Sequence, residues 1–459
     1  MRPGPRIALG IGAELSSNPP QNVGRSRPTA NAAPLPSPPS PMAVFSHRIF
    51  AVAPPGLEPT LGMELANLGI PARVEEGGFE WTGGWDHLIQ GHLHLRTASR
   101  LLVRVGSFRA RALGELERKG GQLPWEDLLP SHRSVRFRIS AGRSRIYHEG
   151  AAEERLQRVL AARGFSLHDS DTGLDAQGSA SDPGPEALPS TVVVRIFRDE
   201  VTVSVDATGG HLHQRGYRLD PGAAPLRETL AAGALLALGW SPTIPLLDPF
   251  AGAGTIAIEA ALRAMNIPPA LATADRAPRP FAFLEWPGFP ADSYHSAAAQ
   301  ARGRILPAPP APILASDRDA GALDALRRNA ERAGVLEHLQ VEQAPLSRAS
   351  DPGPGGWVVT NPPYGARLGE RKALRPLYRA LGRRMGQEWA GRRLALFTAD
   401  PVLERELRLD LEEIFSSRNG GIRVRLMAMP NPAPRPPSPP NGPRPPAPPS
   451  DPWPRPRQS

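Results

Sequence analysis

The chain has 459 residues, a formal net charge of +9 at neutral pH, 56 prolines, 45 glycines and no cysteine. Without cysteine there is no disulfide, no thiolate metal ligand and no cysteine nucleophile, which excludes base methylation through a covalent thiol adduct. No apolar run approaches the roughly 20 residues of a membrane span, and the start lacks the apolar segment of a signal peptide, so we expect a cytoplasmic protein.

Both ends of the chain are rich in proline. Residues 1–42 hold 10 prolines and residues 430–459 hold 15. Such segments bury too little apolar surface to fold, so we expect disordered tails at 1–43 and 430–459. Each tail has four arginines and one acidic residue, so together they supply +6 of the +9. The total charge is therefore weak evidence for a nucleic-acid partner.

A basic segment remains between the tails. From Arg100 to Arg145 there are eleven basic residues against four acidic ones. This local excess indicates contact with nucleic acid, and a solvated surface in an arginine-rich chain is the alternative interpretation.

The first half of the chain reads as an α+β region. Val135, Phe137 and Ile139 alternate with Arg136 and Arg138, which predicts a strand with one buried and one basic face. In chain order we expect a strand at 50–52, a helix at 56–69, the strand at 135–139, a helix at 153–163, a loop at 168–190 and a hairpin of strands 192–197 and 201–205.

From Pro225 onward the pattern changes to apolar strands that alternate with helices. This alternation is typical of an α/β domain, with a parallel sheet covered on both faces. The expected strands are 245–247, 312–315, 357–360, 394–397 and 422–427, and the expected helices are 255–265, 320–333 and 373–387.

The first candidate site is the glycine loop between the strand at 245–247 and the helix that follows. It runs from Asp248 and Pro249 through Gly252 and Gly254 to Thr255. Glycines let the backbone approach a ligand at the carboxyl end of a strand, where the helix amino terminus also points. The spacing fits a nicotinamide or flavin enzyme as well, but a carboxylate before the loop would repel a diphosphate and suits the cationic S-adenosylmethionine.

Two aspartates follow the next strand. Asp317 is placed to accept hydrogen bonds from the ribose hydroxyls of a nucleoside cofactor. Asp319 is interpreted as the N-cap of the next helix. Asp317 lies 63 residues beyond Gly254, much farther than the ~20 of a compact dinucleotide unit, so an insertion around 268–310 must intervene.

The decisive motif is Asn361-Pro362-Pro363-Tyr364 at the end of the strand at 357–360. A planar amine needs two acceptors in its own plane, and the Asn361 side-chain oxygen and the Pro362 carbonyl supply them while Tyr364 stacks on the base. An ordinary turn is the alternative for this peptide alone. Its position after Asp248 and Asp317, each at a strand end, favours direct in-line methyl transfer to an exocyclic amine without a metal or a covalent intermediate.

These motifs and several further segments resemble the THUMP-domain class I RNA methyltransferases, most of all the bacterial enzymes that methylate guanine N2 in 23S ribosomal RNA. The further segments are 56–58, 64–69, 211–218, 224–231 and 316–330. The resemblance implies a ferredoxin-like unit at 44–95, a THUMP RNA-binding domain at 96–206 and a Rossmann-like methyltransferase domain at 207–429, whose parallel sheet has one antiparallel strand.

The resemblance also implies roles for single residues. Arg136 and Arg138 would bind RNA on the THUMP domain, and Arg215 and Arg218 would contact RNA phosphates near the entrance of the active site. Gln343 stands where family members usually hold the adenine amine of the cofactor with an acidic residue.

The implied partner is structured RNA. Large-subunit ribosomal RNA is the first expectation and tRNA the alternative, because tRNA guanine-N2 methyltransferases of the THUMP group share every motif above. We expect no metal, no membrane and no obligate protein partner. Methylation of protein glutamine or of DNA adenine would leave the basic half unexplained. The intact Asp248, Gly252, Gly254, Asp317 and Asn361 disfavour a non-catalytic RNA-binding or assembly module.

Overall fold

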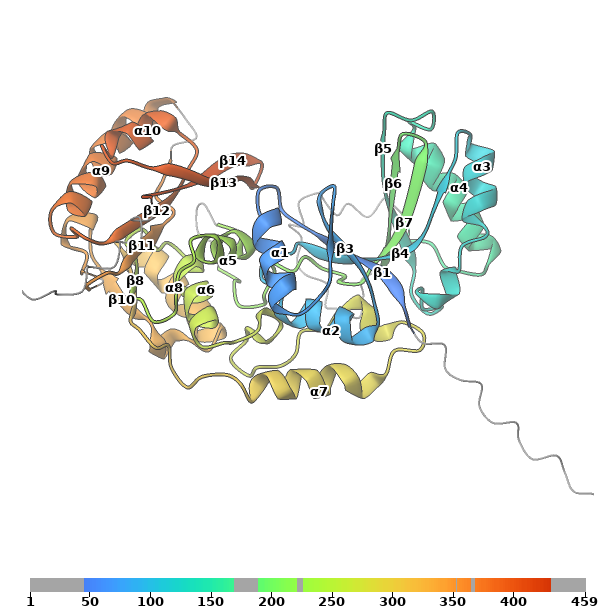
Figure 1. Cartoon of the computed structure of the whole chain (residues 1–459), viewed down its shortest axis with the longest axis horizontal. Coiled ribbons are helices and arrows are strands. Elements are labelled where there is room, and N and C mark those ends of the chain that lie inside the picture. Colours follow the sequence, from blue (N-terminus) through green and yellow to red (C-terminus); the bar gives the residue numbers. More distant parts are fainter. Residues whose placement is uncertain (1–44, 169–188, 221–225, 352, 365–367, 431–459) are drawn as a thin grey trace, which may run out of the picture. The chain divides into compact units, whose positions relative to one another are not determined.

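The computed structural model describes residues 45–168, 189–220, 226–351, 353–364 and 368–430 (Figure 1). The expected tails, apart from Pro430, and most of the expected loop at 168–190 lie outside these residues. Within the described ranges, no helix is long and apolar enough to cross a membrane.

The first half of the described chain is built on a seven-stranded sheet in the order β2-β3-β1-β4-β7-β6-β5. Helix α3 packs against α4, and α4 packs against β5, as Figure 1 shows at its right. The elements are β1 (His47–Val52), α1 (Glu58–Asn67), β2 (Arg73–Glu75), β3 (Gly78–Gly83), α2 (Trp85–His94), β4 (Arg100–Arg109), α3 (Leu113–Gly120), β5 (Val135–Gly142), α4 (Glu149–Ala162), β6 (Ser190–Phe197) and β7 (Glu200–Asp206).

Strand β4 belongs to both parts of this sheet. Its start, from Arg100 to Val103, pairs antiparallel with β1, and from Leu102 to Arg109 it pairs antiparallel with β7. The predicted ferredoxin-like and THUMP units therefore share one strand. The boundary at 95/96 remains a prediction.

The predicted hairpin is present as β6 and β7. Its two turn residues, Arg198 and Asp199, both have positive φ, at 53° and 65°. Positive φ at both central positions gives the type I′ turn, whose twist matches that of paired strands. The Asp199 carboxylate stabilises this turn by accepting hydrogen bonds from the Arg145 backbone N–H at 2.9 Å and the Arg111 side chain at 3.1 Å.

The second half is an α/β domain with the strand order β10-β9-β8-β11-β12-β14-β13. Strands β8 to β12 are parallel, and β14 runs antiparallel to both of its neighbours, as predicted. The elements are α5 (Glu228–Ala237), β8 (Leu246–Asp248), α6 (Thr255–Ala264), η3 (Pro269–Leu271), η4 (Ala282–Glu285), α7 (Ala291–Arg302), β9 (Ile313–Asp317), α8 (Ala320–Arg332), β10 (Gln340–Gln343), β11 (Trp357–Thr360), α9 (Leu368–Gly386), β12 (Arg393–Thr398), α10 (Pro401–Glu406), β13 (Glu412–Asn419) and β14 (Ile422–Ala428).

Two hydrophobic clusters cover the faces of this sheet. Successive strand residues point to opposite faces, so Leu246 joins the large cluster on the α6 side while Leu247 joins a second cluster with Tyr378 and Leu381 of α9. The parallel strands thus end in polar residues above a core that is closed on both sides. This edge carries the candidate site.

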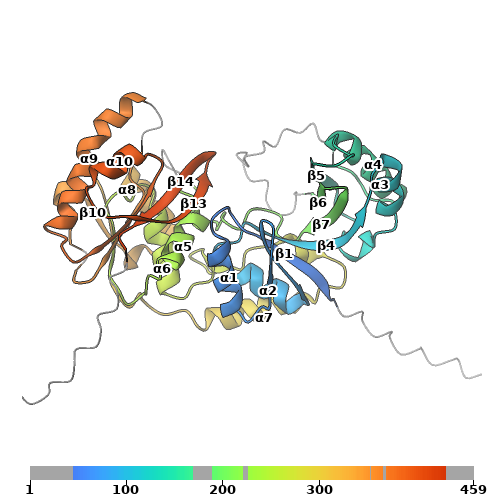
Figure 2. The same ribbon diagram turned by 45° about the horizontal axis from the view of Figure 1, so that its top comes forward.

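The insertion expected between Gly254 and Asp317 contains η3, η4 and α7. Helix α7 and η3 pack against α2, and Figures 1 and 2 both show α7 beside α2. In the same segment, Glu285 accepts a hydrogen bond from Nε of Arg133 at 2.6 Å. The insertion therefore contacts both parts of the first half, at α2 and at Arg133 before β5.

Candidate active site

The glycine loop after β8 adopts a conformation that requires glycine. Gly252 and Gly254 have φ of 52° and 88°. A Cβ atom on Gly254 would lie 2.6 Å from Cγ of Leu326, whereas a Cβ on Gly252 would meet no atom within 4 Å. Gly254 is thus packed tightly against α8, while Gly252 faces open space that a ligand can occupy. The flanking Pro249 and Thr255 are buried.

Asp317 ties the ends of β8 and β9 together. Its Oδ2 accepts a hydrogen bond from the Gly252 backbone N–H at 3.0 Å, and its Oδ1 accepts one from the Asp319 backbone N–H at 3.0 Å. The half-buried carboxylate lies beside the glycine loop, as its predicted cofactor role requires. Asp319 is the N-cap of α8, accepting from the backbone N–H groups of Gly321 and Ala322, as predicted.

Asp248 lies beneath the loop. It is 1% exposed, and its Oδ1 accepts hydrogen bonds from the Thr360 hydroxyl at 2.6 Å and the Phe250 N–H at 3.2 Å. The carboxylate thereby joins the loop to β11, and its predicted contact with the cofactor remains a prediction. Burial, together with the nearby charge of Asp317, raises the pKa of Asp248 to about 7.

Asn329 of α8 supports the glycine loop from the other side. Its buried Nδ2 donates to the Ala253 carbonyl at 3.1 Å and to the Asp220 carbonyl at 2.9 Å. The side chain thereby joins the loop to the end of segment 211–220. The sequence contained only the resemblance of 316–330 to indicate this role.

Asn361 stands directly after β11, at the same sheet edge as the glycine loop. Its Oδ1 is buried and has no hydrogen-bond partner among the described residues. A buried amide oxygen without a donor is costly, and structures normally satisfy it with protein, water or ligand. The atom that the sequence predicts as the acceptor for an amine is therefore available to one.

The rest of the Asn-Pro-Pro-Tyr loop is held by residues that the sequence did not indicate. The hydroxyl of Tyr378 donates to the Pro363 carbonyl at 3.3 Å. The Tyr364 hydroxyl is hydrogen-bonded to the side chain of Asn419, and Oδ1 of Asn419 accepts from the backbone N–H of Arg227 at 3.2 Å. These contacts hold the loop through Pro363 and Tyr364, and none of them uses the Asn361 oxygen. Stacking of Tyr364 on a base remains a prediction.

Gln343 lies at the end of β10, level with Asp317 in the register of the two parallel strands. It is exposed, and its amide donates to the Arg318 carbonyl at 3.5 Å. Its predicted contact with the adenine amine remains a prediction.

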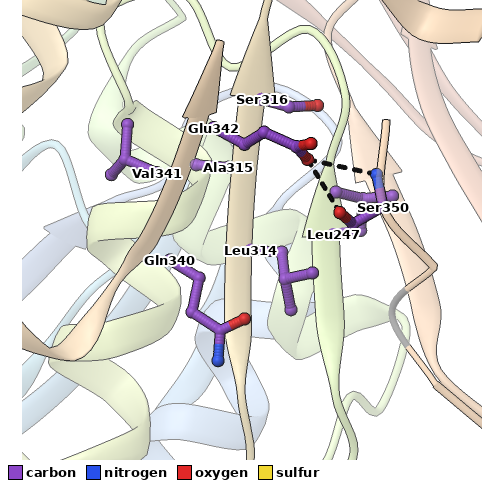
Figure 3. Close-up of a pocket in the computed structure, with 8 residues that line it drawn as sticks. All are labelled: Leu247, Leu314, Ala315, Ser316, Gln340, Val341, Glu342 and Ser350. Carbon is purple, nitrogen blue, oxygen red and sulfur yellow. Dashed lines mark hydrogen bonds between the residues drawn. The ribbon is translucent and has the colours of Figure 1, made fainter. Parts of the chain in front are cut away.

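A pocket on the sheet face next to this edge is drawn in Figure 3. Glu342 reaches across it to the backbone N–H and hydroxyl of Ser350. None of the predicted site residues lines it; its lining residues are Leu247, Leu314, Ala315, Ser316, Gln340, Val341, Glu342 and Ser350.

The predicted phosphate contacts of Arg215 and Arg218 are wrong in this structure. Arg215 is 3% exposed; it forms an ion pair with Glu259 at 3.5 Å and donates to the Arg96 carbonyl at 2.6 Å. Arg218 donates to both carboxylate oxygens of Glu228, at 2.8 and 3.1 Å. Both guanidinium groups are already matched by buried carboxylates, so they stabilise the fold around the site.

Arg136 and Arg138 lie where the alternation predicted, on the face of β5 opposite Val135 and Phe137. Arg138 is exposed, while Arg136 is half-buried and donates to the Thr191 hydroxyl at 2.8 Å. Their contact with RNA remains a prediction.

The strand order, the glycine loop and the Asn-Pro-Pro-Tyr loop at one sheet edge define a class I methyltransferase that uses S-adenosylmethionine. Comparisons with known proteins agree. Residues 215–427 match the family model described as RMKL-like, methyltransferase domain, and residues 48–102 match that of the RlmL ferredoxin-like domain. The chain belongs to the RMKL-like methyltransferase family.

Three known proteins illustrate the similarity. The "Ribosomal RNA large subunit methyltransferase K/L" of Syntrophotalea carbinolica is 33% identical over 83% of this chain and 53% of its own length, so this chain spans about half of that relative. YpsC of Bacillus subtilis, named as an RNA methyltransferase, is 32% identical over 73% of this chain and 84% of its own. The crystal structure of SMU.472, named as a methyltransferase and complexed with S-adenosylhomocysteine, aligns with a TM-score of 0.70 and 26% identity over 84% of this chain and 98% of that one.

Proposed function

We propose that the protein transfers the methyl group of S-adenosylmethionine to the exocyclic N2 amine of a guanine in large-subunit ribosomal RNA. The observation that carries this proposal is the buried Oδ1 of Asn361, which has no partner among the described residues and stands at the sheet edge that also carries the glycine loop. An acceptor in that position selects a substrate with an N–H group.

The chemistry follows from the loop. The Asn361 oxygen and the Pro362 carbonyl accept the two hydrogens of a planar amine, so that the nitrogen lone pair points out of the base plane. The bound cofactor supplies an electrophilic methyl group on a sulfonium. Tyr378 and Asn419 hold Pro363 and Tyr364 in place, which keeps both acceptors preorganised.

The residues that would hold the cofactor fit its chemistry. The half-buried Asp317 carboxylate supplies acceptors for ribose hydroxyls, and Gly252 leaves the space in front of the loop open. The amino terminus of α6 places a positive helix end beside the loop, which suits the carboxylate of the cofactor's amino-acid group.

The choice of ribosomal RNA is supported by the name of the K/L relative, which is similar in sequence to 83% of this chain. A basic strand face on β5 agrees with an RNA substrate, since phosphate contacts dominate affinity for nucleic acids.

The test is incubation of the protein and labelled S-adenosylmethionine with total RNA from cells that lack the gene, followed by nucleoside analysis of separated ribosomal RNA and tRNA. N2-methylguanosine in large-subunit ribosomal RNA is expected, and Asn361→Ala is expected to abolish it while RNA binding is nearly unchanged. Label in tRNA alone would replace ribosomal RNA by tRNA as the substrate. Absence of label from all RNA, with cofactor binding demonstrated, would overturn the proposal.

A further inference from the structure

A group of cationic side chains begins on the open face of the first sheet. Arg136 and Arg138 of β5 project from the face that α4 does not cover. On the neighbouring strands of that face, Asp206 of β7 pairs with Arg100 at the start of β4. The charge of this carboxylate is therefore already matched, which leaves Arg136 and Arg138 as a positive excess.

The group continues into the segment that leads to the methyltransferase domain. Arg100 donates to the Gly209 carbonyl at 3.0 Å, two residues before His211. Arg279 donates to the His211 carbonyl at 3.0 Å, and the rings of His211 and His213 lie 5.0 Å apart. The half-buried His211 thus connects the sheet face to the start of the second domain.

The electrostatics of His211 agree with a positively charged environment at this segment. Burial and the charges of Arg100, Arg138, Arg227 and Arg279 lower the pKa of His211 to about 3. His211 therefore stays neutral among four arginines drawn from β4, β5, the insertion and the start of α5.

The backbone of the last of these arginines is linked to the catalytic loop through Asn419. Arg227 is exposed and is the N-cap residue of α5. Its backbone N–H donates to Asn419 at 3.2 Å, and Asn419 is hydrogen-bonded to the Tyr364 hydroxyl. Asn419 thus links the backbone of Arg227 to Tyr364, the side chain predicted to stack on the base.

We infer that Arg136 and Arg138 on the THUMP sheet and Arg227 beside the catalytic loop form a basic track that binds the RNA sugar-phosphate backbone between that sheet and the target nucleotide. This inference rests on the proposed function and deepens it, since it assigns the phosphate nearest the target base to Arg227. A backbone ligand fits because the exposed members are arginines, which bind phosphate oxygens bidentately.

The track also replaces the contacts predicted for Arg215 and Arg218. Those side chains are neutralised by Glu259 and Glu228, whereas Arg138 and Arg227 are exposed. RNA that follows the track would pass directly from the THUMP sheet to Tyr364.

The experiment measures the affinity of the full chain for protein-free large-subunit ribosomal RNA from cells lacking the gene, over a series of salt concentrations. The variants are Arg138→Gln, Arg227→Gln and the control Arg158→Gln. Arg158 is an exposed arginine of α4, on the covered side of the sheet, where it pairs with Glu154. Each phosphate contact contributes about 0.7–0.9 to the slope of log affinity against log salt.

Arg138→Gln and Arg227→Gln are each expected to lower that slope by about one contact and to weaken binding at low salt about tenfold, whereas Arg158→Gln leaves both unchanged. Cofactor affinity, measured by calorimetry, should equal that of the unmodified chain in all three variants, because none touches the glycine loop.

Failure of the track and failure of the proposed function give different results. If the unmodified chain binds and methylates the RNA but both track variants keep its salt slope, the track is wrong and the function stands. A lower turnover of Arg227→Gln with an unchanged slope would likewise overturn the track. If the unmodified chain neither binds nor methylates any RNA, the proposed function fails and the track fails with it.

Discussion

The hydroxyl of Thr360, at the end of β11, donates a 2.6 Å hydrogen bond to Oδ1 of Asp248, at the end of β8. This contact joins the strand that precedes the catalytic loop to the strand that precedes the glycine loop. It places an acidic group inside the protein, and that group makes stability depend on pH.

We expect replacement of Asp248 by Asn to change how stability varies with pH. The folded-state pKa of Asp248 is raised from 3.8 to about 7. Between these values the unfolded chain releases the proton while the folded chain retains it, so this carboxyl lowers the free energy of unfolding as pH rises from about 4 to 7. Asp248→Asn removes this loss and keeps an acceptor for Thr360.

Denaturant unfolding of both proteins from pH 4 to 8 checks this. The stability of Asp248→Asn relative to the unmodified chain should rise by about 2–4 kcal/mol up to pH 7 and then level off. A difference that is the same at all pH values would contradict the assignment.

Replacement of Tyr378 by Phe should impair catalysis more than cofactor binding. It removes the donor to the Pro363 carbonyl and loosens the loop that carries both acceptors, so kcat should fall roughly tenfold while KM for S-adenosylmethionine stays the same. Tyr294→Phe is the matched control, since its hydroxyl donates to the Arg279 carbonyl at 2.8 Å in the insertion. Steady-state kinetics on RNA separates the two. An equal loss of kcat in both variants would argue for a general effect on folding.

The two glycines of the loop should respond differently to alanine. Gly254→Ala puts a Cβ 2.6 Å from Leu326 at a φ of 88°, so we expect a loss of about 1–3 kcal/mol in the free energy of unfolding. Gly252→Ala meets no protein atom and should cost less stability, yet it fills the space in front of the loop and should weaken cofactor binding. Thermal unfolding and calorimetric titration measure both effects. Unchanged cofactor affinity in Gly252→Ala would show that the ligand lies elsewhere.

Arg215→Gln should destabilise the protein without changing the salt dependence of RNA binding. The variant leaves the buried Glu259 without its ion-pair partner, and the loss of one member of a buried pair costs about 3–5 kcal/mol. Chemical denaturation gives the stability, and binding at several salt concentrations gives the slope. A lower slope, with normal stability, would restore Arg215 as a phosphate contact.

Much of the second domain follows from sequence because its elements are locally determined. The strands expected at 312–315 and 357–360 are short apolar runs, and the structure has them as β9 and β11. The polar residues after these runs, Asp317 and Asn361, had to meet because parallel strands end at a common edge. Pattern and topology alone therefore predict that Asp317 and Asn361 lie at the same edge of the sheet.

The supporting contacts depend on tertiary packing and could not be predicted from local sequence. Asn419 closes the hairpin of β13 and β14, and nothing near it indicates a bond to Tyr364. Arg215 lies in the polar segment 211–218, which favoured an exposed position. One signal was available: Glu259 is the lone acidic residue in the apolar helix Thr255–Ala264, and a buried carboxylate there requires a cationic partner.

Because β4 pairs with both β1 and β7, the chain cannot be cut before β4 without exposing one edge of that strand. A fragment that begins at residue 96 keeps β4 paired with β7 but removes β1 from its other side. The freed edge carries Leu101 and Val103, and an apolar edge with unpaired backbone groups recruits other chains. The first half of the described chain therefore does not separate into two exchangeable modules, and recombination between relatives would have to carry residues 47–206 as one block.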